Sequence, residues 1–262
     1  MLKFTSNMPF FQKIFYILFV VYTMTLSSQA AIRGDVNVIE ASENIRYLSQ
    51  KIVKDYLYYY RNIHNSDLKY DIDRSLTKLS DNFREIAVTT KDSDSKNILD
   101  YLAYSKNDIE KIMKSDMSSE KALQMLNYSE TFLEGADAIE NSHTYNFSKE
   151  EKMLMTTKNM EYLLERISKY YMSLQMGLNI EISKEEMDQA IVDFEANMQQ
   201  VNLYNYPHEV KNIRTKVNKL WKTNRAFFLR GKVLFIPNLL HNSVAYLENA
   251  IAQITLYHSQ NQ

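Results

Sequence analysis

Histidines are the first residues to test for chemistry, because imidazole serves both as a metal ligand and as an acid–base group. They are His64, His143, His208, His241 and His258. No two of them stand at metal-ligand spacing. Glu140-x-x-His143 has the i, i+3 spacing of a di-iron carboxylate bundle, but such a site needs two of these pairs and further glutamates on facing helices. A solvated helix end explains this single pair better, so we predict no metal site.

Motifs for other chemistries are missing as well. The sequence contains no HExxH, no GxSxG and no P-loop. A haem-binding bundle would need inward-facing His or Met ligands, and the thirteen methionines supply candidates, but methionine is an ordinary core filler. Tyr56, Tyr59 and Tyr60 are expected to pack in the core and at its rim rather than to bind a ligand. We expect a protein that is not an enzyme, has no catalytic residues and holds no cofactor.

Composition narrows the class of protein further. Lys and Arg number 31 against 32 Asp and Glu, a balance that argues against nucleic acid as a partner. The absence of cysteine excludes disulfides, iron–sulfur clusters and c-type haem attachment. Four glycines and three prolines in 262 residues leave few sharp turns and favour long helices. The sequence therefore predicts an all-α fold.

Residues 1–30 have the layout of a Sec signal peptide. Lys3 and Lys13 form a basic n-region, IFYILFVVYTMTL forms an apolar core, and Ser28-Gln29-Ala30 is a small-x-small cleavage site. The apolar run is short for a spanning helix, which needs about 20 apolar residues. We expect cleavage after Ala30 and a periplasmic protein. The alternative is an uncleaved N-terminal anchor.

The chain repeats itself at a spacing of 115 residues. NIRYLSQKIVKDY at 44–56 and NMEYLLERISKYY at 159–171 share identical residues at six positions. The apolar stripe of the first copy matches that of the second, residue for residue, as does the stripe of the following segment. The stripes comprise Ile45, Leu48, Ile52, Tyr56 and Tyr59 with Met160, Leu163, Ile167, Tyr171 and Leu174, and Ile72, Leu76, Leu79, Phe83 and Ile86 with Met187, Ile191, Phe194, Met198 and Val201.

Each copy is expected to form four helices, because an amphipathic helix cannot bury its stripe alone. Breaks are predicted at 65–67 and 92–95, and capping boxes at Ser148-x-x-Glu151 and Ser183-x-x-Glu186. We predict two tandem antiparallel four-helix bundles, at 31–143 and 144–262, behind the signal segment at 1–30. One long fused bundle is the alternative architecture.

The segment ASENIRYLSQKIVKDYLY at 41–58 resembles the first helix of the PilJ/NarX-type sensor module, the extracytoplasmic domain of type IV pilus chemotransducers and of nitrate/nitrite sensor kinases. That helix carries a stretch like AGRQRMLSQRMAK, whose core falls on residues 45–51. The second copy is a degraded version that keeps Leu163 and Arg166. The sequence departs from the pattern at Ser42, where the family has glycine, and at Lys51, where it has a second arginine.

The resemblance implies a module that senses a small ligand, with Arg46, Gln50 and Lys51 as the ligand-binding residues. A planar guanidinium suits a small oxyanion. Glu161 replaces Arg46 in the second copy, so an anion site would belong to the first bundle alone. Because the sequence shows no output domain, a membrane-bound receptor or transducer is an expected partner, and a homodimer is compatible with the resemblance. The competing hypothesis is a helical scaffold or adaptor of the cell envelope.

Overall fold

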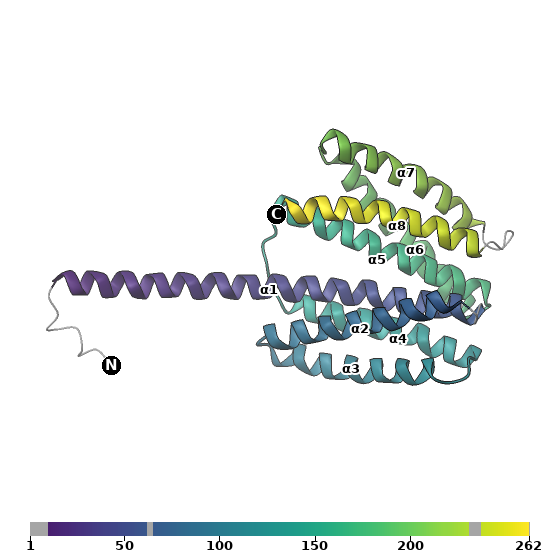
Figure 1. The fold of residues 1–262 in the computed structure, drawn as a ribbon, viewed down its shortest axis with the longest axis horizontal. Coiled ribbons are helices and arrows are strands. Elements are labelled where there is room, and N and C mark those ends of the chain that lie inside the picture. The colour runs from purple at the N-terminus through teal and green to yellow at the C-terminus, as the bar shows by residue number, and fades with distance from the viewer. Residues whose placement is uncertain (1–9, 62–64, 231–236, 262) are drawn as a thin grey trace.

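The structure is a computed structural model that describes residues 10–61, 65–230 and 237–261. Within these ranges the chain forms eight α-helices and no strand (Figure 1). The prediction of an all-α fold is confirmed. The helices are α1 (Phe10–Arg61), α2 (Ser66–Thr89), α3 (Ser93–Met113), α4 (Ser119–Asn141), α5 (Lys149–Gln175), α6 (Ile180–Leu203), α7 (His208–Leu229) and α8 (Pro237–Gln260).

Helix α1 is 52 residues long, and its N-terminal part extends beyond the body formed by the other helices (Figure 1). The predicted signal segment falls in this region. Residues 1–9 lie outside the described residues, and side chains are described only from residue 34 on. In the part of the chain so described, no helix is both long enough and apolar enough to cross a bilayer. The signal peptide and its cleavage stay predictions.

The predicted apolar stripes form the core of the molecule. Of their residues in α1, α2, α5 and α6, only Tyr59, Leu174 and Met198 are partly exposed, and the others are buried. Burying one such side chain contributes about 1.5–3 kcal/mol. Removing a fully buried one, as in Leu79→Ala, would cost about 2–5 kcal/mol because it also leaves a cavity.

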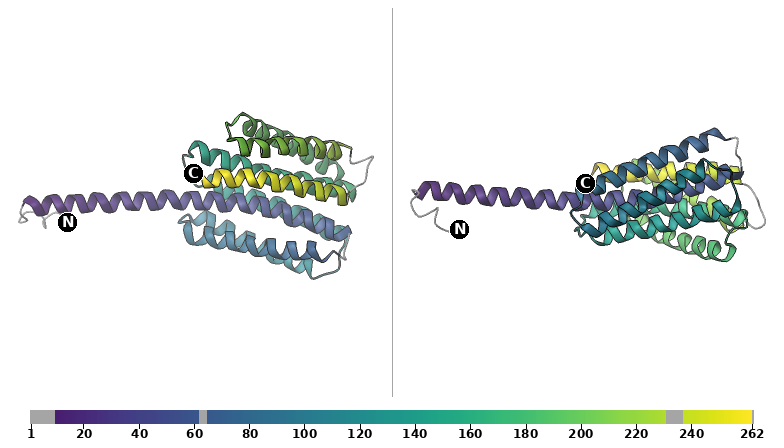
Figure 2. Two further views of the ribbon diagram at one scale, coloured as in Figure 1. Left: turned by 45° about the horizontal axis from the view of Figure 1, so that its top comes forward. Right: turned by 90° about the horizontal axis from the view of Figure 1, so that it is seen from below.

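Helices α1 and α5 lie at the centre of the body. Helix α1 packs against α2, α4 and α5, and α5 packs against α6, α8 and α1. Helices α2–α4 lie on one side of α1 and helices α5–α8 on the other (Figures 1 and 2). Glu40 approaches Lys158, and further along both helices Lys54 approaches Glu165. Because both residue numbers rise together, α1 and α5 run parallel.

Three of the four predicted helix starts are confirmed. Asn65 and Asp92 cap α2 and α3 with side-chain oxygens, and Ser148 forms a complete capping box with Glu151 at the start of α5. The capping box predicted at Ser183 is wrong. Helix α6 begins earlier, at Ile180, after Asn179 in a left-handed conformation with φ 41°. Ser183 consequently lies inside the helix, where its hydroxyl donates to the Leu178 carbonyl at 3.0 Å.

Candidate functional site

Arg46 lies on α1, and its guanidinium is surrounded by carboxylates. Nη1 donates to Glu43 Oε1 at 2.6 Å, and Nη2 lies 2.8 Å from Glu140 Oε2 on α4. Asp137, one turn before Glu140, accepts a hydrogen bond from Nε. An oxyanion at Arg46 would have to displace one carboxylate, and the other two would repel it. The oxyanion site therefore stays a prediction, and the local charge does not favour it.

Gln50 and Lys51 do not converge with Arg46 on one ligand site. Gln50 is fully buried, and its amide nitrogen donates to the Ser129 carbonyl of α4 at 3.2 Å. Lys51 donates to Asp55 on its own helix at 2.8 Å. Arg46 and Gln50 thus meet α4, whereas Lys51 is held by a carboxylate one turn further along α1.

A group of buried charges between α1 and α5, which the sequence reasoning missed, forms the best-built polar site. We call it the charged seam, and it consists of Lys51, Lys54 and Asp55 of α1 with Glu165 of α5. Lys54 Nζ lies 2.8 Å from Glu165 Oε2 and 3.2 Å from Asp55 Oδ1. Lys54, Asp55 and Glu165 are each exposed by 3% or less. Burial lowers the pKa of Lys54, but the two carboxylates outweigh it and raise this pKa well above its usual range.

A second buried group joins α5 to α4. We call it the Lys169 cluster, which consists of Ser129 and Glu130 of α4 with Arg166 and Lys169 of α5. Lys169 Nζ donates to Ser129 Oγ at 2.8 Å and to Glu130 Oε1 at 2.6 Å, and Arg166 pairs with the same carboxylate. Burial lowers the pKa of Lys169 to about 7. Burial also raises the pKa of Glu130, but Lys169 and Arg166 more than offset this and bring it down to about 2.

The two groups occupy equivalent positions of the repeat. Lys54 and Lys169 are 115 residues apart, as are Gln50 and Glu165. Lys54 finds a carboxylate across the seam, at Glu165. Gln50 is the residue of the first repeat that corresponds to Glu165, and it is neutral, so it cannot pair with Lys169 as Glu165 pairs with Lys54. Lys169 pairs instead with Glu130 of α4. The one sequence signal for these groups is the identity of Lys54 and Lys169 within the repeat.

Ser129 and Lys169 have the distance of a serine–lysine catalytic pair, in which a neutral lysine takes the hydroxyl proton. Both side chains are 0% exposed, and neither lines any of the surface hollows described below. Ser129 Oγ also donates to the Leu126 carbonyl of its own helix at 2.7 Å. A substrate carbonyl could not reach this hydroxyl, so we assign the pair to packing.

Metal chemistry finds no support in the part of the chain that the structure describes. No group of three or more His, Asp or Glu in these residues could hold a metal ion. Glu140 is engaged by Arg46, while His143 contacts the Thr90 hydroxyl and the Ile139 carbonyl. The two residues of the Glu-x-x-His spacing therefore serve different contacts.

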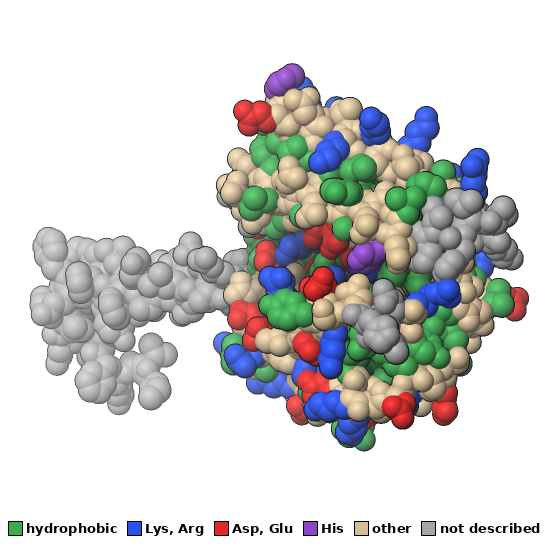
Figure 3. Space-filling model, turned by 45° about the vertical axis from the view of Figure 1, so that its right-hand side comes forward, with side chains coloured by type: hydrophobic (Ala, Val, Ile, Leu, Met, Phe, Trp, Pro, Cys, Tyr) green, Lys and Arg blue, Asp and Glu red, His purple; other side chains and the backbone are tan. Residues whose placement is uncertain are grey.

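Charges at equivalent positions near the centre of the molecule are reversed between the halves. Glu43 of α1 corresponds to Lys158 of α5, and Arg46 corresponds to Glu161. Burial raises the pKa of both Glu43 and Glu161 to about 7, while the nearby charge of Lys158 lowers each. Where the two halves meet, an acidic position of one repeat thus faces a basic position of the other. Acidic and basic side chains also intermingle on the face drawn in Figure 3.

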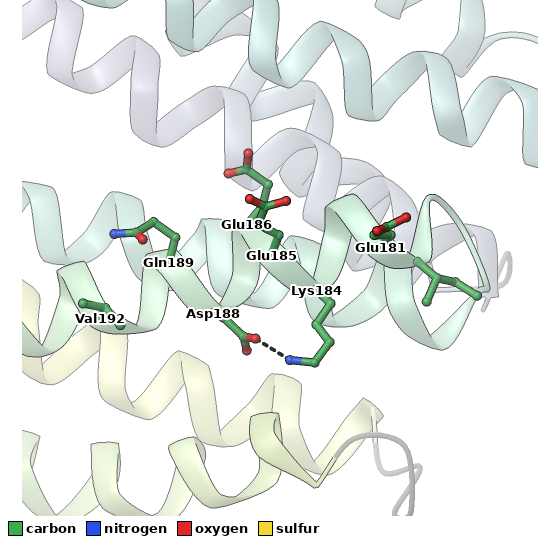
Figure 4. A pocket seen from close by; sticks show the side chains of 8 residues that line it. Glu181, Lys184, Glu185, Glu186, Asp188, Gln189 and Val192 are labelled. Atoms are coloured by element: carbon green, nitrogen blue, oxygen red, sulfur yellow. Dashed lines mark hydrogen bonds and ion pairs between the residues drawn. The ribbon is translucent and has the colours of Figure 1, made fainter.

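The most voluminous hollow that we describe lies on α6 and measures about 630 Å³. Its lining residues all come from that one helix, between Ile180 and Val192. Figure 4 shows that these side chains point in different directions, with Lys184 and Asp188 paired on one side and Glu186 on the other. Side chains that diverge cannot enclose a ligand, so we do not regard this hollow as a binding site.

Comparison with protein-family models, with curated proteins and with solved structures finds no match for this chain. A family assignment therefore has no support beyond the sequence resemblance.

Proposed function

We propose that the protein is a non-enzymatic, sensor-type binding module in which a small polar solute changes the packing of α1 against α5. The observation that carries the proposal is the charged seam. In this proposal the chain consists of two four-helix bundles, α1–α4 and α5–α8, joined through their first helices. The contacts of α1 with α2 and α4, and the matching contacts of α5 with α6 and α8, support this arrangement.

A seam of charges is an unusual way to join two helical halves. Replacing a buried ion pair by well-packed apolar residues is often neutral or stabilising by about 1–4 kcal/mol. Stability alone therefore does not explain why Lys54, Asp55 and Glu165 are buried together. Lys54 lies between the carboxylates of Asp55 and Glu165 and can pair more closely with either of them. Such alternative pairings allow a helix pair to have two arrangements. A ligand that binds one arrangement more tightly shifts the population toward it.

In the alternative in which residues 1–30 are kept as an N-terminal anchor, helix α1 offers a route for output, because it continues from the seam into the part of the chain that extends beyond the body (Figure 1). A displacement of α1 relative to α5 would move this extension as a rigid rod. A membrane-bound receptor or transducer is the partner that fits such an output. The carboxylates around Arg46 make a simple oxyanion the less favoured ligand.

A solute screen followed by hydrogen exchange tests the proposal. The full chain is screened by thermal shift against nitrate, nitrite, phosphate, simple sugars, polyamines and free amino acids. A solute at 100 times its Kd adds about 2.7 kcal/mol of stability, which gives a clear rise in Tm. We expect at least one class to raise Tm and to slow exchange in peptides covering 48–58 and 162–172.

The matched variants are Lys54→Met/Glu165→Leu in the seam and Lys184→Met/Asp188→Leu on the exposed face of α6. The seam variant should still bind the solute but lose the exchange response in the seam peptides, and the α6 variant should keep it. The proposal is wrong if no class raises Tm, or if binding leaves the seam peptides unchanged in the wild type.

A scaffold function is the second candidate, and exposed aromatic residues on α3 favour it. Tyr101 and Tyr104 are exposed by 62% and 63%, one turn apart. Tyrosine is enriched at protein interfaces because it combines apolar area with a hydrogen-bonding hydroxyl. A photo-crosslinking residue at position 101, with position 70 on α2 as the control, should give a discrete adduct in cells from position 101 alone. Equal or absent crosslinking at both positions would speak against the scaffold.

A further inference from the structure

Two surface grooves lie at equivalent positions of the two repeats. The first groove, of about 270 Å³, is lined mainly by α1 and α2, and the second groove, of about 380 Å³, by α5 and α6. Adding 115 to six of the nine residue numbers that line the first groove gives residues that line the second. Four lining positions are identical in the two grooves: Asn44 and Asn159, Tyr47 and Tyr162, Leu48 and Leu163, and Asn82 and Asn197.

Burial in the core does not explain why the asparagines are the same in both halves. Leu48 and Leu163 are core residues, so burial accounts for their identity. The asparagines are partly exposed, and asparagine is a poorer helix former than alanine. In the first groove Asn44 donates to Asn82 at 3.0 Å, which joins α1 to α2 and aligns the two amides. The repeated amides therefore point to a shared ligand-binding role.

Each groove presents both signs of charge. Lys158 and Glu161 of α5 line the first groove together with the asparagines. Arg166 of α5 and Glu186 of α6 line the second, where they pair at 2.6 Å. A simple anion or cation would meet like charge in either groove. A ligand that carries an ammonium and a carboxylate meets a charge of each sign in both grooves, and in the second groove its carboxylate would have to displace Glu186 from Arg166.

Glu43 gives the first groove a buried acceptor. Its side chain is 6% exposed and lines the groove, with Oε1 held by Arg46 and Oε2 without a hydrogen-bond partner among the described residues. A buried carboxylate oxygen without a partner is costly, and the positive charge of a ligand ammonium bound beside Glu43 would stabilise the carboxylate. Burial raises the pKa of this carboxyl to about 7.

We infer that the two grooves are a duplicated binding site for a small zwitterion of the free amino-acid class, one molecule in each half. Both volumes are at or below the low end of the roughly 300–1,000 Å³ of drug-sized ligand sites, so the ligand must be small. The inference rests on the proposed function and names its ligand class. The first groove is lined by residues of α1 and α5, so a ligand there would lie beside both helices of the seam.

Isothermal titration of the full chain with free amino acids tests the inference. The twenty L-amino acids are ranked by thermal shift, and the strongest is titrated beside its N-acetyl and amide derivatives. We expect two molecules per chain, and at least a tenfold loss of affinity when either charge of the ligand is blocked. Asn82→Ala and Asn197→Ala should each reduce the stoichiometry to one, and the double variant should abolish binding.

Asn107→Ala, at an exposed position of α3, is the matched control and should keep two sites. Thermal unfolding of each variant without ligand shows whether it folds. The inference is overturned if no amino acid binds, or if binding survives in the double asparagine variant. If another solute class binds and alters the seam while no amino acid does, the proposed function stands and the amino-acid assignment fails.

Discussion

Lys54 on α1 and Glu165 on α5 form an ion pair across 111 positions of sequence, with Nζ 2.8 Å from Oε2 and both side chains hidden from solvent. The pair joins α1 to α5, the first helices of the two repeats. Its energetics follow from what is left behind when one member is removed.

Lys54→Met should destabilise the protein by about 3–5 kcal/mol, because it leaves the Glu165 carboxylate buried without its cation. Lys54→Met/Glu165→Leu should recover most of this loss, since Asp55 keeps its contact with Lys51. Urea unfolding of the wild type, both single variants and the double variant measures the coupling. A double variant as unstable as the sum of the single variants would contradict a direct ion pair.

The pH dependence of stability should show the effect of Glu161. Burial raises its pKa from 4.5 to about 7 in the folded protein. Between these values the folded state holds a proton that the unfolded state releases, so stability falls as the pH rises from 4.5 to 7. Glu161→Gln should remove on the order of 2 kcal/mol of this fall. Chemical unfolding at several pH values measures it, and Glu134→Gln, at an exposed position of α4, should leave the slope unchanged.

The end of α8 should depend on a buried histidine. His258 Nε2 lies 2.8 Å from the Tyr206 hydroxyl, and Nδ1 lies 3.1 Å from Glu150 at the start of α5. Tyr206→Phe should cost about 1–2 kcal/mol by leaving a buried ring nitrogen without a partner. Hydrogen exchange should speed up in the last turns of α8. Tyr70→Phe, at an exposed position, serves as the control and should change neither stability nor exchange.

Acid should weaken the same contact. Burial lowers the pKa of His258 below 6.5, so the unfolded chain binds a proton more readily than the folded one. Stability in wild type should therefore fall as the pH drops through the range just below 6.5. His258→Gln should flatten this part of the curve, and an unchanged curve would show that the ring does not titrate on unfolding.

The two serines with capping-box spacing should behave differently. Ser148→Ala should cost about 1 kcal/mol and speed up exchange in the first turn of α5, because Ser148 accepts from the Glu151 amide. Ser183→Ala should leave the first turn of α6 unchanged, since the helix begins after Asn179. Its cost would come from a buried hydroxyl that also contacts Ser173 at 2.8 Å. Faster exchange at the start of α6 in Ser183→Ala would contradict the observed helix start.

Local patterns explain which parts of the fold were predictable. The stripe of Ile45, Leu48 and Ile52 follows the helical period, and burial of such a stripe depends on its own spacing. Because the sequence repeats at a spacing of 115 residues, the same stripe also predicted the buried face of α5. The start of α6 was missed because the spacing of Ser183 and Glu186 fits a capping box. The usable signal was the pair Gly177 and Asn179, residue types that favour the left-handed conformation both adopt.

The candidate site could not be predicted, because its chemistry depends on how the helices are aligned against one another. In the sequence Arg46 looked available for an anion. In the structure its guanidinium donates to Asp137, a residue of α4 that lies 91 positions away in sequence. Lys54 and Glu165 belong to different copies of the repeat, and only the parallel packing of α1 and α5 brings them together. Helical periodicity predicts on which face of its helix a residue lies, but it does not predict which residue of another helix that side chain contacts.

The reversed charges at Glu43 and Lys158 bear on how the chain associates. A second copy of the first half, placed where the second half lies, would set Glu43 against another Glu43. Repulsion between like charges would disfavour pairing of either half with a second copy of itself, and attraction between opposite charges would favour pairing of the two unlike halves. The duplication thus carries its own specificity: expressed as two separate polypeptides, the halves would form a heterodimer in preference to two homodimers.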